Sequence, residues 1–231
     1  MKNLIGISGK MGSGKDTVGY IVQYLTDPYA KEMDRSFEEW LNEESELPEV
    51  PVGYVYTESD WEIKKYADKL KDIVCVLIGC TRKQLEDNEF KNTPLNSDWD
   101  DSHGISTPRE LLQVLGTDCG RDMIHTNLWT ISLFADYKPK NCYDIEGRQL
   151  RMKSLPKWVI TDMRFPNELS YIKDRGGITI RVNTTRAGKV SNHESETALD
   201  NSTFDHVIDN SGTFDELVEN VREILVKEGI L

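Results

Sequence analysis

Hydrophobic residues along this chain follow two spacings, one typical of buried strands and one typical of amphipathic helices. Short runs rich in apolar residues predict strands, at 4–7, 62–67, 158–161, 178–182 and 207–208. Apolar residues repeated every three or four positions predict helices between them, at 15–25, 68–78, 107–115, 128–137, 166–174 and 213–225. This alternation favours an α/β fold with a mainly parallel sheet, in which ligands bind at the carboxyl ends of the strands.

Capping boxes mark the starts of several predicted helices. A box pairs a hydroxyl residue with a glutamate or glutamine three positions later, and each side chain satisfies a backbone N–H near the other. The pairs are Ser36 and Glu39, Thr81 and Gln84, Thr107 and Glu110, and Thr213 and Glu216. Pro108 adds a second start signal at the first helical position. Gly79 and Gly116 are predicted to end two of the helices.

Residues 29–60 do not continue the alternation and are interpreted as an insertion on the surface. We expect a short helix around Trp40, then an acidic loop that contains prolines, and then a hairpin formed by 53–57 with 62–67. No chemistry is assigned to this insertion.

Three later stretches are polar and rich in turn formers. Residues 91–106 predict a long loop after a short helix that ends near Asn88, and loops of this length are often functional. The basic stretch 138–156 is either a loop or a small hairpin. Residues 183–197 form a polar segment.

The opening strand runs into a glycine-rich turn of the phosphate-binding type. Residues 9–17 read G-K-M-G-S-G-K-D-T, and a helix is predicted to begin at Lys15. Glycines let successive backbone N–H groups point at phosphate oxygens, and the helix N-terminus adds about half a unit of positive charge. Lys15 supplies a full positive charge, and a hydroxyl just after it is suited to bind Mg²⁺.

One position departs from the strict phosphate-loop pattern, which has serine or threonine directly after the lysine. Asp16 stands there in this chain, and the hydroxyl follows one residue later, at Thr17. Adenylate-kinase-like loops have the same displacement. The alternative is a glycine-rich turn without a ligand. The strand, loop, lysine, hydroxyl and helix together favour phosphate binding.

Composition narrows the class of ligand. The chain has 231 residues, a formal net charge of −12 and 38% hydrophobic residues, which fits one large domain with a real core. A sequence-independent nucleic-acid binder typically neutralises about 6–10 phosphates with lysine and arginine, and a chain this acidic is poorly suited to that task. A mononucleotide needs only a few cations in one cleft. We therefore expect a small anionic ligand and no nucleic acid polymer.

The sequence also argues against a membrane or a zinc site. No apolar run is long enough to cross a bilayer, and the N-terminus is predicted to be a strand rather than a signal peptide. We expect a soluble, cytoplasmic protein without a membrane partner. The cysteines, at positions 75, 80, 119 and 142, are scattered and expected to be free and reduced. The histidines are scattered as well.

A carboxylate and a guanidinium stand together at the end of the predicted strand 158–161. Asp162 follows the strand directly, as a magnesium-orienting carboxylate does in phosphate-loop proteins, and Arg164 comes two residues later. Such a pair is suited to hold a metal ion and a phosphate at one edge of the sheet. The alternative is an aspartate that caps a turn beside a surface arginine. The glycine loop upstream favours the first interpretation.

Phosphoryl transfer needs positioning and charge neutralisation more than covalent chemistry, so several basic residues should converge on the site. The candidates are Lys10, Lys71, Arg82, Lys91, Arg109, Arg164, Arg181 and Arg186. Each of them alone is as readily a solvated surface charge. Arg109 is favoured because it lies in the first turn of a well-marked helix. Trp129 either stacks on a base or packs in the core, which is the commoner role of a helical tryptophan.

Several sequence blocks, spread in order over most of the chain, resemble those of one family. They are G-K-M-G-S-G-K-D-T, R-E-L-L-Q-V-L-G-T-D at 109–118, the helix with Trp129, V-I-T-D-M-R-F-P-N-E at 159–168, H-E-S-E at 193–196 and D-N-S-G-T-F-D-E-L at 209–217. Together they resemble the phage-type deoxynucleoside monophosphate kinases. Many kinases share the first block, whereas L-G-T-D and T-D-x-R-F-P-N-E are much more specific. Residues 29–60 are the clearest unmatched part.

The resemblance implies a three-layer α/β phosphate-loop kinase fold, with a five-stranded parallel sheet, helices on both faces, a monophosphate-binding region and a lid. It accordingly predicts a single domain over 1–231, with the insertion at 29–60, the monophosphate-binding region at 81–106 and the lid at 183–197. It implies ATP with Mg²⁺ as donor and a deoxynucleoside 5′-monophosphate as acceptor, giving the diphosphate. If the chain is encoded by a phage, its compartment is the host cytoplasm.

The resemblance also implies roles for individual residues. The donor is expected to contact the loop and a lid arginine, through Gly12, Ser13, Gly14, Lys15, Asp16, Thr17 and Arg186. The acceptor is expected to contact Lys10, Lys71, Lys91, Arg109, Gly116, Thr117, Trp129, Arg164 and Glu168. In this scheme Thr17 and Asp162 organise Mg²⁺, and the catalytic residues are Lys15, Arg109, Asp162 and Arg164. The lid would exclude water, whose attack would waste ATP.

Two other functions stay open at this point. Another small-molecule kinase on the same scaffold, such as a dephospho-coenzyme A kinase, is disfavoured by the T-D-x-R block and the helix with Trp129. A nucleotide-binding regulator without turnover does not need so many phosphate-binding arginines. The sequence predicts neither the base preference nor whether the chain forms a homodimer.

Overall fold

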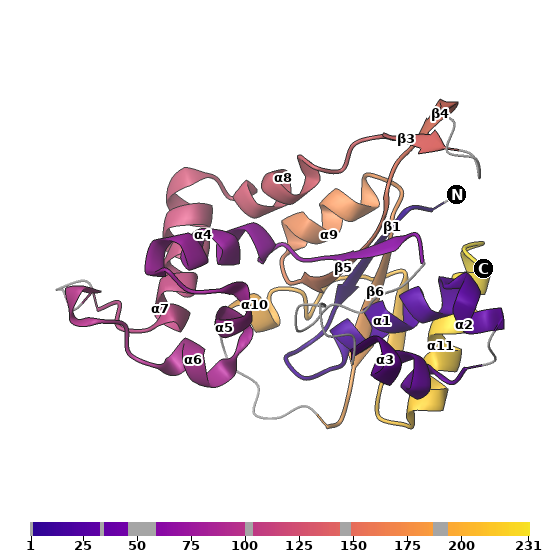
Figure 1. Cartoon of the computed structure of the whole chain (residues 1–231), viewed down its shortest axis with the longest axis horizontal. Coiled ribbons are helices and arrows are strands. Elements are labelled where there is room, and N and C mark those ends of the chain that lie inside the picture. Colours follow the sequence, from indigo (N-terminus) through magenta and orange to yellow (C-terminus); the bar gives the residue numbers. More distant parts are fainter. Residues whose placement is uncertain (1, 33–34, 46–58, 100–103, 144–148, 187–193) are drawn as a thin grey trace. The chain divides into compact units, whose positions relative to one another are not determined.

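A computed structural model describes residues 2–32, 35–45, 59–99, 104–143, 149–186 and 194–231 (Figure 1). The chain divides into two compact units, which are described separately. The first unit comprises Met1–Lys65 with Tyr137–Leu231, and the second comprises Tyr66–Asp136. Within the described ranges, no helix is long and apolar enough to span a membrane.

The first unit is built on a five-stranded sheet in which all neighbouring strands are parallel. In spatial order the strands are β2 (Trp61–Lys64), β5 (Lys157–Met163), β1 (Leu4–Ser8), β6 (Ile178–Asn183) and β7 (His206–Asp209). The central strand β1 pairs through Ile5 with Val159 on one side and with Ile178 on the other. The predicted strands and their parallel arrangement are confirmed.

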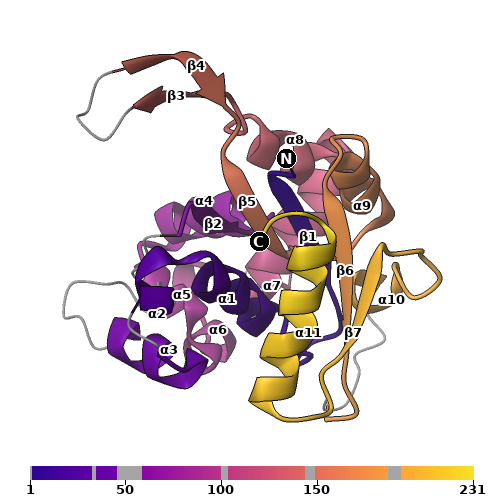
Figure 2. The same ribbon diagram turned by 90° about the vertical axis from the view of Figure 1, so that its right-hand side faces the viewer.

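Helices cover both faces of this sheet (Figure 2). The helices of the described part of the first unit are α1 (Lys15–Thr26), α2 (Pro28–Glu32), α3 (Phe37–Ser45), α9 (Pro166–Lys173), α10 (Glu194–Thr197) and α11 (Phe214–Lys227). Ile5 and Ile7 share a core cluster with residues of α1 and α11. Gly6 points to the opposite face, because side chains alternate along a strand. A Cβ on Gly6 would lie 2.2 Å from Cδ1 of Ile172 in α9, so α9 covers that face and the three predicted layers are confirmed.

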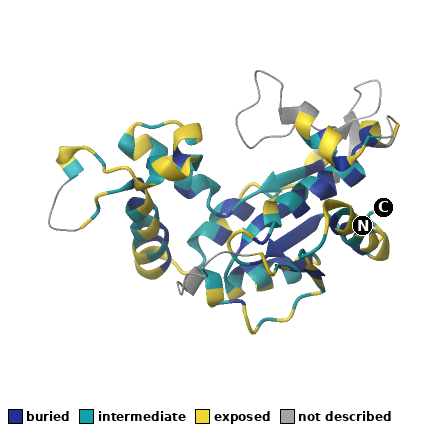
Figure 3. Cartoon of the chain, turned by 90° about the horizontal axis from the view of Figure 1, so that it is seen from below, coloured by how far each residue is buried: buried dark blue, intermediate teal, exposed yellow. Residues whose placement is uncertain are grey.

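The buried residues gather on the strands of the sheet and on the helix faces that cover them (Figure 3). The first unit also carries a two-stranded antiparallel sheet, formed by β3 (Lys140–Tyr143) and β4 (Gln149–Ser154). Of the two alternatives for 138–156, the small hairpin is therefore confirmed.

The interpretation of 29–60 as a surface excursion is wrong for the part that the structure describes. Phe37 and Trp40 of α3 are buried in the main core, where Tyr24 of α1 lies 5.6 Å and 5.8 Å from their rings, centroid to centroid. The Trp40 indole N–H also donates to Asp27 at 3.2 Å. The capping box of Ser36 is present and begins a helix whose aromatic residues, three positions apart, face α1 together.

The other expectations for this segment have different outcomes. The predicted strand 53–57 lies outside the described residues, as does most of the predicted acidic loop. The helix α3 extends to Ser45, into the start of that loop. The strand β2 begins one residue earlier than predicted and pairs in parallel with β5.

The second unit is helical in the part that the structure describes. Its elements are α4 (Asp68–Ile78), α5 (Arg82–Glu86), α6 (Asn88–Asn92), the 3₁₀ helix η1 (Ser97–Trp99), α7 (Pro108–Gln113), the π-helix η2 (Val114–Ile124) and α8 (Leu128–Phe134). Its small core contains Leu70, Val74, Leu85 and Leu111. The capping boxes at Thr81 and Thr107 are both present, as is the box at Thr213 in the first unit.

The prediction that Gly116 ends a helix is wrong. The chain continues from α7 into η2 without a break, and a bond from the His125 N–H to the Gly120 carbonyl has the i to i−5 spacing of a π-helix. Gly116 is buried, and a Cβ there would lie 2.9 Å from Cδ2 of Leu70 in α4. At this position glycine allows α4 to pack closely against η2, and it does not end a helix.

Candidate active site

The turn after β1 curls as a phosphate-binding loop requires. Gly12 and Gly14 have φ of 78° and 92°, a region that favours glycine. Gly14 is the N-cap of α1, so the N–H groups that begin the helix open onto the loop. The loop also packs tightly, because a Cβ on Gly14 would lie 2.4 Å from Nδ2 of Asn210. Asn210 in turn donates to the Ser13 carbonyl at 3.0 Å.

Lys15 is folded back over this loop. Its ammonium group donates to the carbonyls of Gly9 at 2.6 Å and Lys10 at 2.8 Å. Burial, followed by the positive charge of Arg164, lowers the pKa of Lys15 to about 8, although nearby carboxylates oppose this shift. These carboxylates are Asp16, Asp162 and Glu196. The predicted residues Lys15, Asp16, Asp162 and Arg164 therefore share one electrostatic cluster in the first unit.

Lys65 belongs to the same cluster and was not predicted from the sequence. It follows β2, and its ammonium nitrogen lies 2.9 Å from Oδ1 of Asp16. The same carboxylate oxygen accepts a 2.5 Å hydrogen bond from the Thr161 hydroxyl. Burial alone would lower the pKa of Lys65, but the charges of Asp16 and Asp162 outweigh it and raise this pKa above its usual value. The only signal in the sequence was its place near the carboxyl end of a predicted parallel strand.

Arg164 is held from both ends. Its backbone N–H donates to Oε2 of Glu168 at 2.7 Å, and the N–H of Phe165 donates to the same oxygen at 3.0 Å. Its guanidinium forms an ion pair with Glu196 of α10. Glu168 is buried and caps α9, so it positions the turn that carries Arg164. Its predicted contact with the acceptor stays a prediction.

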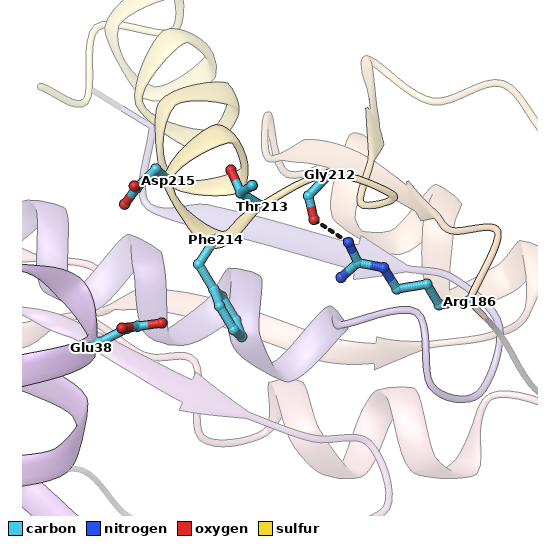
Figure 4. Close-up of a pocket in the computed structure, with 6 residues that line it drawn as sticks. All are labelled: Glu38, Arg186, Gly212, Thr213, Phe214 and Asp215. Carbon is cyan, nitrogen blue, oxygen red and sulfur yellow. Dashed lines mark hydrogen bonds between the residues drawn. The ribbon is translucent and has the colours of Figure 1, made fainter.

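Arg186 lies at a cavity of about 370 Å³ on the first unit (Figure 4). Glu38, Gly212, Thr213, Phe214 and Asp215 complete its lining. The Arg186 guanidinium donates to the carbonyls of Ser211, at 2.8 Å, and Gly212. The chain just before Ser211 touches the phosphate loop through Asn210. Arg186 is therefore anchored to a segment that also contacts the loop.

Lys10 contacts the segment that follows α10. Its ammonium nitrogen lies 3.2 Å from Asp200, which also pairs with Arg181 at 2.8 Å. Arg181 in turn donates to the Ser8 hydroxyl at 3.2 Å. These contacts connect the segment after α10 to β1 and the start of the loop.

The predicted basic residues of the second unit divide into two groups. Lys71 is engaged by both carboxylate oxygens of Glu86, at 2.7 and 2.8 Å. Arg82 contacts Glu86 as well, together with Asp68 and Asp72. These bonds tie α4 to α5, so the part that Arg82 plays here is structural.

Lys91 and Arg109 form the second group. Burial, the positive charge of Lys71 and, to a smaller extent, that of Arg109 lower the pKa of Lys91. Arg109, in the first turn of α7, donates to the side-chain carbonyl of Asn92 at 2.8 Å. Lys71, although paired with Glu86, and Arg109 thus both lie close to Lys91 within the second unit.

Trp129 is half-buried and packs against the small core of the second unit. Its indole N–H donates to the Gly116 carbonyl at 2.7 Å, and a Cβ on Gly120 would lie 2.8 Å from its ring. The core role is thus observed, and base stacking stays a prediction. Thr117 follows Gly116 in η2 and is half-buried.

The side chains near the loop that could bind a metal ion offer oxygen atoms as ligands. Among the described residues, no group of three or more His, Cys, Asp or Glu side chains is gathered as a metal site. Mg²⁺ commonly takes one or two protein oxygens and completes its shell with phosphate and water. Thr17 and Asp162 fit that requirement by their chemistry. The described cysteines at 75, 80 and 119 are free thiols.

A parallel sheet whose first strand leads through a glycine loop into a helix, with cations and carboxylates around that loop, defines the class of phosphate-loop kinases. The comparison with known proteins is narrower. A family model described as deoxynucleotide monophosphate kinase matches residues 81–221, which is more than half of the chain. The chain belongs to the deoxynucleotide monophosphate kinase family, and it is a phosphotransferase.

Two relatives match along most of their length. A putative deoxynucleotide monophosphate kinase of Acanthamoeba polyphaga mimivirus is 28% identical over 228 residues, covering 94% of this chain and 93% of the relative. A deoxynucleoside-5′-monophosphate kinase of Escherichia phage T5 is 26% identical over 231 residues, covering 86% of each chain. Both matches extend well beyond the glycine loop, which many kinases share.

Proposed function

We propose that this enzyme transfers the γ-phosphoryl group of ATP to a deoxynucleoside 5′-monophosphate, giving ADP and a deoxynucleoside diphosphate. The observation that carries the proposal is the loop after β1, where Lys15 is folded over the backbone and shares one charge cluster with Asp162 and Arg164. A second nucleotide as acceptor follows from the family to which the chain belongs.

The donor phosphates bind the N–H groups of the loop from Gly12 to Thr17, and Lys15 neutralises their charge. To do so, the Lys15 ammonium group exchanges its bonds to the Gly9 and Lys10 carbonyls for phosphate oxygens. Arg186 contacts the donor from the cavity that it lines. Hydrogen bonds to an ionised partner are about twice as strong as neutral ones, which favours this exchange.

Thr17 and Asp162 are the residues that would hold Mg²⁺. When bound, the ion neutralises part of the charge on the donor phosphates. Asp16, which stands where a hydroxyl is usual, is bound by Lys65 and Thr161. We therefore assign Asp16 to the positioning of Lys65 and of the first turn of α1.

The acceptor is bound by cations and by the chain around Gly116. Arg109, Lys71 and Lys91 bind its phosphate, and Gly116, Thr117 and Trp129 are the further acceptor residues proposed in the second unit. In the first unit, Arg164 takes part of the charge of the transferred group in the transition state. Phosphoryl transfer requires little more from a protein than this positioning and neutralisation.

An assay of ADP release across a panel of acceptors tests the proposal. ATP and Mg²⁺ are supplied with dAMP, dGMP, dCMP, dTMP or dephospho-coenzyme A, and a reaction without acceptor is the control. We expect release that depends on at least one deoxynucleoside monophosphate. Release only with dephospho-coenzyme A would show a different kinase on the same scaffold. Binding of ATP without any acceptor-dependent release would indicate a regulator.

A further inference from the structure

The H-E-S-E block includes an acidic residue to which the proposed reaction gives no role. Glu196 lies in α10, and its carboxylate reaches the phosphate loop. Its Oε2 accepts a hydrogen bond from the Met11 N–H at 2.8 Å, and its Oε1 forms the ion pair with Arg164. Only 8% of the Glu196 side chain is exposed. A carboxylate of the chain itself is thus bound to the loop and to Arg164.

The surroundings of this carboxylate suit a phosphate equally well. A backbone N–H of the loop and a guanidinium are the donors that bind phosphate and carboxylate oxygens alike. Burial would raise the pKa of Glu196, but Arg164, the Met11 N–H and Lys15 outweigh it and lower this pKa below its usual value. Glu196 therefore carries its negative charge among the groups that neutralise phosphate.

The segment after Glu196 is connected to the loop by a second ion pair. Asp200 contacts Lys10, the residue before Met11, at 3.2 Å, and its backbone N–H bonds to the Thr197 carbonyl of α10. Two acidic residues from this short segment thus contact two consecutive residues of the loop. The helix α10 itself has four residues, too few to be stable without such contacts.

We propose that the Met11 N–H and Arg164 form a phosphoryl-binding subsite that Glu196 occupies in the free enzyme, so that a nucleotide phosphate binds there by displacing Glu196. The proposal rests on the proposed function, and the ligand is a phosphoryl group of either the donor or the acceptor. Only the fraction of molecules in which Glu196 has left the subsite can bind this group, and the apparent Kd is the intrinsic Kd divided by that fraction.

The test is a binding titration of the variant Glu196→Gln. Glutamine keeps the size of the side chain and an oxygen that accepts from Met11, but it removes the charge that pairs with Arg164. Calorimetry measures the Kd of ATP alone, and of dAMP, dGMP, dCMP and dTMP each alone. We expect a Kd about 10-fold lower than that of the wild type for at least one ligand. Tighter binding of ATP assigns the subsite to the donor, and tighter binding of a monophosphate assigns it to the acceptor.

Two further variants separate the loss of Glu196 from the subsite from the general effect of removing one negative charge. Glu219→Gln removes the same charge from an exposed side chain of α11, which pairs only loosely with Arg222 at 3.3 Å, and should leave every Kd within about twofold. Glu196→Ala removes the contacts to both Met11 and Arg164. It should lower the Kd of the same ligand as the glutamine variant does. Folding of each variant is checked by its thermal transition.

Weaker or unchanged binding of all five ligands by a folded Glu196→Gln variant would overturn the proposal. Such a result would mean that Glu196 supports Arg164 in its binding conformation instead of competing with phosphate. The titration requires no turnover. An enzyme that transfers phosphate to none of the acceptors would therefore contradict the proposed function while leaving this test intact.

Discussion

The two units of this molecule contain charge clusters of similar composition whose partners differ in kind. The loop cluster of the first unit consists of Lys15, Lys65, Arg164, Asp16, Asp162 and Glu196. The helix cluster of the second unit consists of Lys71, Arg82, Asp68, Asp72 and Glu86. In the loop cluster, side chains contact the backbone of the glycine loop as well as each other. In the helix cluster, side chains pair with each other and tie two helices together.

This difference shows that the partners of a basic residue indicate its function better than its charge does. Lys15 bonds to two backbone carbonyls, which a phosphate can replace at little cost. Arg82 contacts three carboxylates, and removing it leaves all three without that cation. Both residues were candidates for phosphate binding on sequence grounds. From these partners we propose that Lys15 binds phosphate and that Arg82 contributes to stability.

The largest effect is expected from Lys15→Ala. Removing a charged donor aimed at the transferring group typically costs about 100- to 1000-fold in rate, and we expect kcat to fall by at least that much. The fold should be kept, because among the described residues the Lys15 side chain forms hydrogen bonds to its own loop alone. Steady-state ADP release and the thermal transition measure the two effects, with the exposed Lys227→Ala as control. Near-wild-type turnover by a folded Lys15→Ala protein would refute the assigned role.

The next effect is expected from Arg109→Ala. Loss of one charge-assisted contact to the acceptor phosphate should raise the KM for the acceptor about 10-fold. The KM for ATP and the thermal transition should stay close to those of the wild type. Arg222→Ala, on the surface of α11, is the matched control. An equal rise in both KM values, or unfolding of the variant, would contradict a role confined to the acceptor.

Arg82→Ala should lower stability and leave activity almost unchanged, which is the opposite of what we expect for Arg109→Ala. The network is partly exposed to solvent, so we expect a loss of about 1 kcal/mol in the free energy of unfolding. The kcat/KM for the acceptor should stay within about twofold at a temperature where the variant is folded. Urea denaturation measures the first quantity, and the neighbouring Lys83→Ala is the control. A large loss of activity with an unchanged free energy of unfolding would contradict the structural role of Arg82 and of the helix cluster.

The smallest expected effect is on the pH dependence of the free energy of unfolding. Burial would raise the pKa of Glu86, but Lys71 and Arg82 outweigh it and lower this pKa in the folded state. A lowered folded pKa gives stability above the unfolded value of about 4.3, and this stability is lost as the pH falls through the folded pKa. Glu86→Gln should therefore narrow the difference in unfolding free energy between about pH 6 and pH 3.5, by less than about 1 kcal/mol. An unchanged difference would show that Glu86 gains nothing from the network.

Features set by neighbouring residues could be predicted from the sequence. The glycine loop and the capping boxes depend on residues within a few positions of each other, and the structure has them where they were expected. The strand that leads to Arg164 was also found, because its apolar run is continuous, although it extends to Met163 and so includes Asp162. Short-range chemistry determines these features whatever the rest of the chain does.

Features set by distant contacts could not be predicted in the same way. Gly116 resembles a helix end until Leu70 is known to pack against it. Trp40 resembles part of a surface insertion until α1 is known to lie beneath it. Lys65 carries no motif, and its pairing with Asp16 depends on the order of the strands. In each case the decisive neighbour is far away along the chain.

The central claim is that the loop cluster passes a phosphoryl group from one nucleotide to another, and a label-transfer experiment tests it most directly. The enzyme is mixed with ATP labelled in the γ-phosphoryl group and with a deoxynucleoside monophosphate, and the products are separated after a single turnover. We predict that the label appears in the deoxynucleoside diphosphate. Label that stays in ATP with every acceptor, or that appears only in inorganic phosphate, would contradict the account.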